Sequence, residues 1–442
     1  MRLLEGYSSV KNLLTGRFGL MLTGNVLTIL INILTVKILT NKLSTADFGS
    51  YSLIISFSTL PQLVLYAPIS SAIFPQLQNK NGGEDYVALQ KDIFDLFLLV
   101  ASCLSIAFVG IYLLSLIVPT ASSDLIVVGF IATLFSTSLS FLGTLDTFSL
   151  ATHHIKEYLA LPLLNIFVKL LILCGLYSIQ VSPERLVVIF IVVHLLLSVL
   201  EYHFLRHRKI ITYRFRAKMY DIFTLNTPKK IEILTYASNF FLWGVFGWLQ
   251  SFFDKWILNI YIDKNAVAIY TVYYQYGFFP FTVMSSVVSQ YITPLYFKNI
   301  YEDEKRRFMK RLLKFSVVSL LAILVVAGSL SYFLAPYFIG LLTNEAYLKY
   351  INLFPLIVFA GCFYGLGQII TVPLLDSDLV KKVRFPKIFT AVVSVMLFWT
   401  LISIMGFSGI LTALIMSNVL YYGLLFLISH KHCWSDKLNK VK

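Results

Sequence analysis

The chain has 442 residues, of which 58% are hydrophobic and 13% charged, and its mean hydropathy is +0.79. A soluble domain carries roughly 25% charged residues, so this composition excludes a protein whose whole surface faces water. The formal net charge of +14 would suggest nucleic acid as the partner of a soluble protein, but basic residues of membrane proteins accumulate in cytoplasmic loops. We therefore expect a membrane as partner and no nucleic acid.

Long apolar segments recur along the chain, and many reach the ~20 residues that a helix needs to cross a bilayer. Strands of a membrane barrel would instead alternate over about 10 residues. We predict an all-α polytopic membrane protein with twelve transmembrane helices. Their predicted ranges are 17–40, 47–77, 93–118, 124–149, 158–178, 186–205, 232–261, 265–296, 313–335, 349–375, 386–405 and 408–428.

The basic residues test this topology. With a cytoplasmic N-terminus, 29 of the 36 basic residues fall in inner segments, and only Lys42, Arg185, Lys264 and Lys349 fall in outer loops. This asymmetry predicts that both termini are cytoplasmic. The first apolar segment is too long for a signal-peptide core and has no small-residue cleavage site after it, so we expect an uncleaved first span.

A long basic segment divides the spans into six and six. We predict an N-terminal lobe over 1–205, a basic cytoplasmic linker over 206–231, a C-terminal lobe over 232–429 and a cytoplasmic tail over 430–442. The sequence holds no Gly-rich phosphate loop, and its four scattered cysteines fit neither a metal site nor a disulfide framework. We therefore predict no enzyme, no metal, no cofactor and no nucleotide-driven transport.

The two lobes share an internal repeat that involves prolines. Residues 46–77 align with 265–296 at a constant offset of 219, with five identities in 32 positions. The aligned identities are Tyr51 with Tyr270, Pro61 with Pro280, Val64 with Val283, Ser70 with Ser289 and Pro75 with Pro294. Pro68 has no partner in this alignment, because Val287 stands there.

The second copy lies six spans after the first, so both run in the same direction. This predicts two parallel six-helix lobes around a central cavity, with the Pro-interrupted spans near the transport site. We interpret Pro61, Pro75, Pro280 and Pro294 as bends that shape this cavity. The alternative, that they only bend packed helices, stays open.

Polar side chains form stripes on two otherwise apolar spans. Asn25 and Asn32 share a face of the first span, and Gln250 and Asp254 share a face of the seventh. Such stripes face a bundle interior or a cavity rather than lipid, so these residues are candidates for binding substrate, and Asp254 also for the coupling ion. Lys255 is a further candidate cation that Asp254 could neutralise. The alternative role is hydrogen bonding between helices.

Spans five and six carry the most specific combination of residues. Asn165 and Lys169 share one face, and His194, Ser198 and Glu201 follow one another at spacings of four and three. A lysine near the bilayer centre costs at least ~2.5 kcal/mol, which calls for a functional reason. We predict that Lys169 binds an anion such as phosphate and that His194 and Glu201 carry protons; a buried structural pair is the alternative.

Aromatic side chains and a small-residue motif mark two later spans. Tyr273 and Tyr274 lie in "YTVYYQY" and suit the binding of sugar rings, although an aromatic belt is equally expected at a span end. Gly361 and Gly365 form a GxxxG motif that predicts close helix packing.

Two segments carry a family resemblance. They are "LSTADFGSYSLIISFSTL" (43–60) and "FDKWILNIYIDKNAVAIYTVYYQYGFFPF" (253–281), and both resemble polysaccharide flippases of the Wzx type. These flippases belong to a superfamily that also includes the multidrug and toxin extruders and the lipid II flippase. The family pattern is matched by Leu43, Asp47, Phe48, Gly49 and Tyr51, and in the second copy by Asp254 and Tyr270, where Ala268 replaces a glycine.

The resemblance implies translocation of undecaprenyl-diphosphate-linked oligosaccharide from the cytoplasmic to the outer leaflet. The translocated units would be used for the synthesis of O-antigen, the polysaccharide of lipopolysaccharide, or of another surface polysaccharide. It further implies alternating access between the lobes, proton or cation coupling, a cationic lumen that includes Lys169 and Lys255, and a polysaccharide polymerase and chain-length regulator as partners. A drug or cation antiporter of the same fold and a non-transporting partner of the polymerase remain alternatives.

Overall fold

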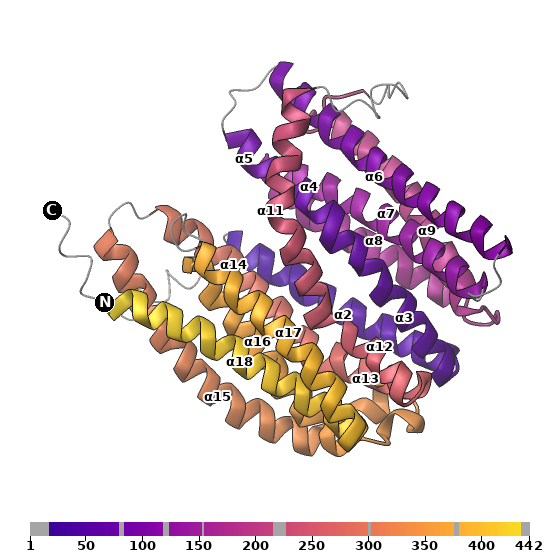
Figure 1. Ribbon diagram of the computed structural model, residues 1–442, viewed down its shortest axis with the longest axis vertical. Helices are drawn as coiled ribbons and strands as arrows, with labels where there is room; N and C mark the ends of the chain where they lie inside the picture. The colour runs from indigo at the N-terminus through magenta and orange to yellow at the C-terminus, as the bar shows by residue number, and fades with distance from the viewer. Residues whose placement is uncertain are drawn as a thin grey trace. The chain divides into compact units, whose positions relative to one another are not determined.

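The computed structural model describes residues 17–78, 84–117, 123–152, 154–214, 227–298, 302–374 and 380–434. All regular structure in these ranges is helical, and no β-strand occurs within them (Figure 1). The predicted all-α fold class is therefore confirmed.

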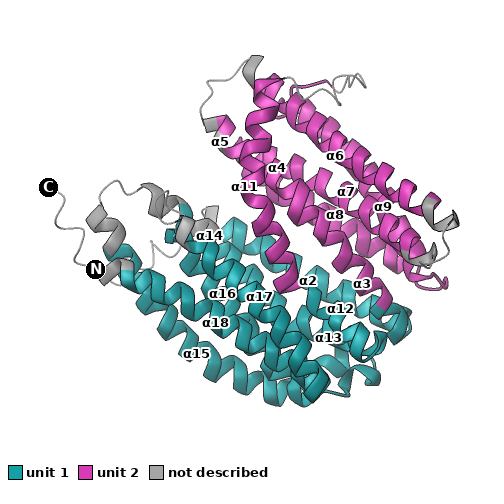
Figure 2. Cartoon of the chain, viewed as in Figure 1, with its two compact units in different colours: residues 1–49, 253–442 teal, residues 50–252 magenta. Residues whose placement is uncertain are grey.

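The chain divides into two compact units, drawn in teal and magenta in Figure 2. Unit 1 contains residues 1–49 and 253–442, and unit 2 contains residues 50–252. Unlike the sequence-based division at 206–231, this grouping by contacts places the first long helix with the C-terminal half. It places the helix that follows the basic segment with the N-terminal half.

Unit 2 begins within helix α3 and ends after α11. Its elements are α3 (Thr45–Pro61), the π-helix η1 (Gln62–Tyr66), α4 (Ala67–Ser71), α5 (Ile73–Gln78), α6 (Glu84–Ile117), α7 (Ser123–Ala151), α8 (Ile155–Gly175), α9 (Pro183–His207) and α11 (Pro228–Ser251).

Unit 1 combines one early helix with the C-terminal half of the chain. Its elements are α2 (Arg17–Lys42), α12 (Phe253–Tyr261), α13 (Lys264–Tyr273), the π-helix η2 (Tyr274–Phe278), α14 (Phe279–Lys298), α15 (Glu302–Leu342), the 3-10 turns η3 (Glu345–Leu348) and η4 (Ile351–Leu353), α16 (Phe354–Leu374), α17 (Val380–Met405) and α18 (Phe407–Trp434).

Specific contacts explain why α2 and α11 belong to these units. In unit 1, Asn344 Nδ2 donates to the carbonyl oxygen of Thr40 on α2 at 3.2 Å. In unit 2, the Trp248 indole on α11 donates to the carbonyl oxygen of Ser56 at 2.8 Å. Gly244 on α11 lets the backbone of η1 approach closely, because a Cβ there would lie 2.3 Å from the carbonyl oxygen of Leu63.

Ten helices in the described ranges are long and apolar enough to cross a membrane. They coincide with ten of the twelve predicted spans. The other two predicted spans are series of shorter helices: 232–261 changes from α11 to α12 at Phe252, and 265–296 is divided into α13, η2 and α14. The count of twelve thus agrees with the structure when these two interrupted spans are included.

The entry motif before Tyr51 has a structural explanation. Ser44 caps α3, since its hydroxyl accepts from the Asp47 backbone N–H at 3.1 Å and donates to the Asp47 carboxylate at 2.7 Å. A Cβ on Gly49 would lie 2.0 Å from the carbonyl oxygen of Lys264. Glycine is therefore required where α3 passes the start of α13, within unit 1.

The first part of the predicted linker is part of the core of unit 2. Gln90 on α6 donates from Nε2 to the carbonyl oxygen of Ile210 at 3.0 Å, and its Oε1 accepts from the backbone N–H groups of Thr212 and Tyr213, each at 3.0 Å. Ile210 and Tyr213 are buried in the same hydrophobic cluster as the α6 side chains. Residues 208–214, called the strap below, are therefore held on α6.

Each of the two π-helices precedes a proline at the same distance. In η1 and η2 the backbone N–H of the following residue, Ala67 or Phe279, donates to the carbonyl oxygen five residues back. Pro68 and Pro280 come directly after these residues. A proline clashes with the carbonyl group four residues earlier, and in both cases that group lies in the wider π turn. Local geometry thus places Pro280 in the position of Pro68.

The other prolines of the repeat occupy different positions. Pro61 is the last residue of α3 and directly precedes η1. Pro75 and Pro294 lie on α5 and α14, and their side chains fall outside the described ones. The sequence alignment, at an offset of 219, pairs Pro280 with Pro61. The position after each π-helix, at an offset of 212, instead pairs Pro280 with Pro68, which has no partner in the sequence alignment.

The GxxxG motif on α16 acts as predicted in helix packing. A Cβ on Gly361 would lie 2.8 Å from the Cα of Phe278, and one on Gly365 would lie 3.0 Å from the carbonyl oxygen of Phe281. These two glycines allow α16 to approach the backbone of η2 and α14 within unit 1.

Candidate functional site

Helices α7, α8 and α9 pack together in unit 2 (Figure 1) and bring the predicted residues of spans five and six into one cluster. His194 on α9 is fully buried. Its Nδ1 lies 3.3 Å from Ser138 Oγ on α7, while its Nε2 has no hydrogen-bond partner. The half-buried Lys169 on α8 lies close enough to His194 to act on it electrostatically.

Lys169 has no carboxylate within ion-pair distance, as far as the described ranges show. Asn165, one turn earlier on α8, is buried, and its Oδ1 also has no hydrogen-bond partner. The Lys169 ammonium group and the Oδ1 acceptor of Asn165 lie on one face of an apolar helix, and they suit a ligand that carries both a negative charge and hydroxyl donors. The structure thus places Lys169 near His194, with Asn165 one turn before Lys169 on α8.

Glu201 lies two turns after His194 on α9 and is buried. Its carboxyl group lies within hydrogen-bonding reach of the carboxyl group of Asp146 on α7. Sequence reasoning missed Asp146, although an isolated aspartate in the apolar segment "FLGTLDTFSL" is a usable signal. The pair places an ionisable group on each side of the α7–α9 contact.

A second cluster lies in unit 1, around Asp254. Asp254 is fully buried and accepts a hydrogen bond from the hydroxyl of Tyr270, and its Oδ1 accepts from the backbone N–H of Lys255 at 2.8 Å. The Lys255 ammonium lies 5.6 Å from the centre of the Tyr274 ring, which stacks on Phe278 at 4.4 Å. The aspartate and the neighbouring lysine are thus compensated by each other and by tyrosines.

The remaining predicted lumen residues are distributed differently. Tyr273 is fully buried in unit 1, and its hydroxyl donates to the carbonyl oxygen of Tyr347 at 2.8 Å. Asn25 and Asn32 are half-buried on α2, where Asn25 Nδ2 donates to the Met21 carbonyl oxygen at 2.8 Å. Gln250 is buried at the end of α11 in unit 2. The contacts of Tyr273 are those of a core residue.

A buried lysine in unit 1 was counted by sequence among the basic residues of the cytoplasmic side. Lys387 on α17 is 4% exposed. Its ammonium group lies 5.3 Å from the centre of the Tyr421 ring and 5.8 Å from that of Tyr364. Charge counting assigned it to the cytoplasmic interface, because periodicity alone does not show that α16 and α18 cover this turn.

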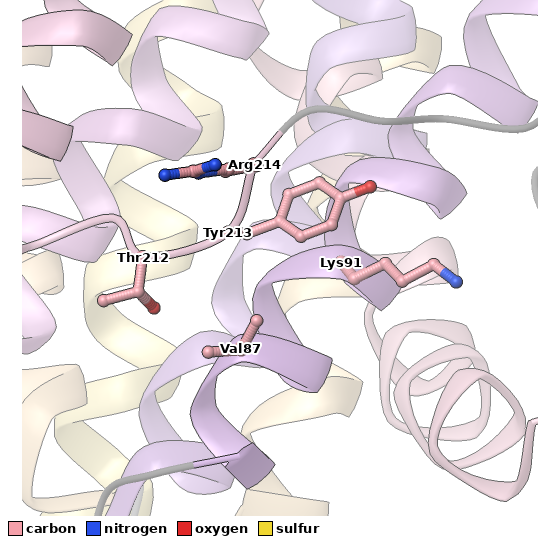
Figure 3. A pocket seen from close by; sticks show the side chains of 5 residues that line it. All are labelled: Val87, Lys91, Thr212, Tyr213 and Arg214. Carbon is pink, nitrogen blue, oxygen red and sulfur yellow. The ribbon is translucent and has the colours of Figure 1, made fainter.

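A shallow groove of about 460 Å³ lies where the strap crosses α6. Its lining includes two basic side chains, Lys91 and Arg214, with Val87, Thr212 and Tyr213. Figure 3 shows Lys91 and Arg214 pointing away from each other on either side of the Tyr213 ring. The two cations would attract anionic head groups in general, but they do not converge on a single position.

No protein-family model matches the sequence, and no curated protein matches it. Several solved structures do resemble the whole chain. An inward-facing multidrug resistance MATE family transporter of the MOP superfamily has a TM-score of 0.62 at 14% identity, over 96% of this chain and 100% of that chain. Lipid II flippase MurJ in an inward closed conformation has a TM-score of 0.63 at 15% identity, over 96% of this chain and 93% of that chain.

A variant of the Vibrio cholerae MATE transporter VcmN also resembles the chain, with a TM-score of 0.58 at 13% identity over 98% of both chains. These identities are low, so the likeness concerns the fold. The chain is a polytopic helical membrane protein with the fold that MATE transporters and MurJ share.

Proposed function

We propose that the protein is a flippase that moves undecaprenyl-diphosphate-linked oligosaccharide from the cytoplasmic to the outer leaflet of the bacterial inner membrane. The product would supply O-antigen or a related surface polysaccharide. Similarity to MurJ, which is named a lipid II flippase, supports a lipid-linked substrate, and the entry motif around Gly49 supports the polysaccharide branch.

The observation that carries this proposal is the position of Lys169. Its side chain lies on an apolar helix beside His194 and Asn165, with no carboxylate in ion-pair distance within the described ranges. A lysine binds phosphate as a point charge, and a diphosphate that enters the bundle would offset the cost of placing this cation there. A drug cation at the same place would be repelled.

The mechanism follows from these roles. We infer alternating access between the predicted lobes 1–205 and 232–429, with the lipid tails kept in the bilayer while the head group crosses. Lys169 and Lys255 would hold the diphosphate, and Tyr274, Asn165 and the polar residues of α2 and α11 would contact sugar hydroxyls and rings. Uptake of a proton or another cation at His194, Glu201 or Asp254 would drive the return of the empty carrier.

The proposal includes location and partners. Both termini would be cytoplasmic, as the basic residues predict. The polysaccharide polymerase and chain-length regulator would act on the product in the outer leaflet. No cofactor takes part, because the driving force is a gradient.

Lys169→Ala tests the proposal in cells that lack the chromosomal gene. We expect surface glycan to fall toward the level of the deletion strain while the amount of membrane-inserted protein stays unchanged. Lys169→Arg keeps the charge and should restore part of the export. Lys156→Ala removes an exposed lysine of the same helix and should export normally. Normal glycan in Lys169→Ala would remove Lys169 from the transport site.

One observation favours a drug or cation antiporter as second candidate. Asp254 lies with Tyr270 and Tyr274 in an acidic and aromatic cluster of the kind that suits organic cations. In that case deletion of the gene would leave surface glycan intact and lower resistance to cationic drugs. The same two measurements on one deletion strain therefore separate the candidates.

A further inference from the structure

The contact between Asp146 and Glu201 joins two acidic side chains on different helices. Glu201 is 6% exposed, and its Oε1 has no hydrogen-bond donor as partner. Oδ1 of Asp146 is likewise buried without a donor. The two carboxyl groups are nevertheless within hydrogen-bonding reach of each other.

An ionised carboxylate only accepts hydrogen bonds. Two carboxylates in contact repel each other strongly, and in a poorly solvated interior they cannot both be ionised. A hydrogen bond between them therefore requires a proton on one of them. The remaining negative charge is then shared by the pair, as in other carboxyl pairs whose protons are released in two separate steps.

We propose that Asp146 and Glu201 form a one-proton binding site between α7 and α9, and that this site couples proton movement to translocation. The proton site rests on the contact itself, and only the coupling rests on the proposed function. Asp146 is thereby assigned a role that sequence analysis did not give it.

The other ionisable groups around the pair have separate partners. Tyr158 on α8 interacts electrostatically with Asp146 and is the neighbour that can donate to it. Lys169, also on α8, acts on His194. Among the groups of α6, Asp95 pairs with Lys230, and Lys91 acts on Asp92.

The three remaining elements packed against α7 leave the pair without a counter-ion. Tyr66 of η1 is hydrogen-bonded to Thr137 at 2.8 Å, and the short helices α4 and α5 carry no ionisable side chain. No cation is therefore seen to neutralise the pair within the described ranges, so a proton is the available compensating charge.

His194 extends the polar groups of the α7–α9 interface beyond the pair. Its Nε2 is fully buried and has no partner, and its Nδ1 lies 3.3 Å from Ser138 Oγ on α7. His194 lies two turns, about 10 Å along the helix, from Glu201. These groups can accept and pass on a proton, which gives the pair a route into the cluster that contains Lys169.

The coupled step is balanced in protons and charge. While water reaches the pair from the outer side, one proton binds to it, and the charge of the pair changes from two negative charges to one. The pair keeps this proton while it is shielded from water, because its two carboxylates cannot both be ionised there. When water reaches the pair from the cytoplasm, the same proton is released, and two solvated negative charges are restored. The outward-to-inward return of the lobes would thus be driven by the proton gradient.

Infrared difference spectroscopy of the purified protein in nanodiscs tests the site without any substrate. At neutral pH the wild type should show the carbonyl stretch of a protonated carboxyl group that shifts in heavy water. Asp146→Asn and Glu201→Gln should both lose this band. Each amide can still donate to the remaining carboxylate, so both variants should fold. Glu232→Gln, at an exposed carboxylate, should retain it.

Surface glycan in cells that carry the same variants tests the coupling. We expect Asp146→Asn and Glu201→Gln to lose export and Glu232→Gln to keep it. The absence of the band from the wild type, or its persistence in both single variants, would overturn the proton site. Normal export in either variant would overturn the coupling. If the deletion strain itself has normal glycan, the proposed function fails while the infrared result stands independently.

Discussion

Lys230 and Asp95 form a buried ion pair in unit 2, with 3.0 Å between Nζ and Oδ2 and with side chains that are 2% and 1% exposed. The pair joins the first turn of α11 to the middle of α6. Asp92, one turn before Asp95, also interacts with the ammonium of Lys230. Lys230 therefore acts on two carboxylates at this contact, and Lys229 and Lys91 also act on Asp92.

We expect Lys230→Met to destabilise the protein by about 3–5 kcal/mol, because it leaves buried carboxylates without their cation. Asp95→Asn should have a smaller effect, since Asp92 remains as a partner of the lysine. The midpoint of thermal unfolding in detergent measures both. Lys156→Met is the control at an exposed lysine. Equal midpoints for Lys230→Met and this control would contradict the structural role of the pair.

The same lysine shows what the sequence could and could not predict. Lys230 and Lys387 were both counted among the basic residues of the cytoplasmic side, yet both are buried. Hydropathy and charge asymmetry define where spans lie, because they depend on each segment alone. Which helix covers the first turn of a span depends on tertiary packing, which no local pattern contains.

Within spans five and six, helical spacing alone was enough to predict which side chains lie near each other. Lys169 and His194 lie on the consecutive helices α8 and α9, so their proximity follows from geometry along the chain. Helix α8 separates Asp146 on α7 from Glu201 on α9 along the chain, and the sequence analysis did not identify Asp146. Its partner is recognisable only once α7 and α9 are known to pack together.

Gln90 tests whether the strap is a fixed part of unit 2. Gln90→Leu should leave the backbone N–H groups of Thr212 and Tyr213 without their acceptor, at a cost of about 1–3 kcal/mol for each buried group. We therefore expect the strap to detach from α6 and trypsin to cleave it faster after Lys209. Gln180→Leu changes an exposed glutamine and should leave the cleavage rate unchanged. An unchanged rate in Gln90→Leu would mean that the strap is held by its apolar side chains.

Gly244 tests the close approach of α11 to the π-helix η1. Gly244→Ala would place a Cβ 2.3 Å from the Leu63 carbonyl oxygen, so the helices must separate, at a cost of about 1–3 kcal/mol. Gly143→Ala is a matched control, since nothing lies within 4 Å of its Cβ position and alanine favours the helix. The unfolding midpoint should fall in the first variant and rise slightly in the second. A midpoint that is unchanged in Gly244→Ala would show that η1 can yield at this contact.

Pro68 and Pro280 test whether the two π-helices serve the transport cycle. Each proline prevents the regular hydrogen bond to the carbonyl group four residues earlier, which lies in the π turn. Pro68→Ala and Pro280→Ala each restore a backbone N–H, so the turn can tighten to the regular α-helical pattern. We expect unfolding midpoints that are equal to or above that of the wild type, together with reduced export of surface glycan.

Pro355→Ala is the control for these two variants. Pro355 lies in the first turn of α16, where a proline displaces no intrahelical hydrogen bond. This variant should export normally. If Pro68→Ala and Pro280→Ala also exported normally at unchanged stability, the π-helices would be packing features of each unit rather than bends that the lobes use when they change conformation. Reduced export at raised stability would instead show that the irregular turns are kept for movement, because a tighter helix would then be more stable and less active.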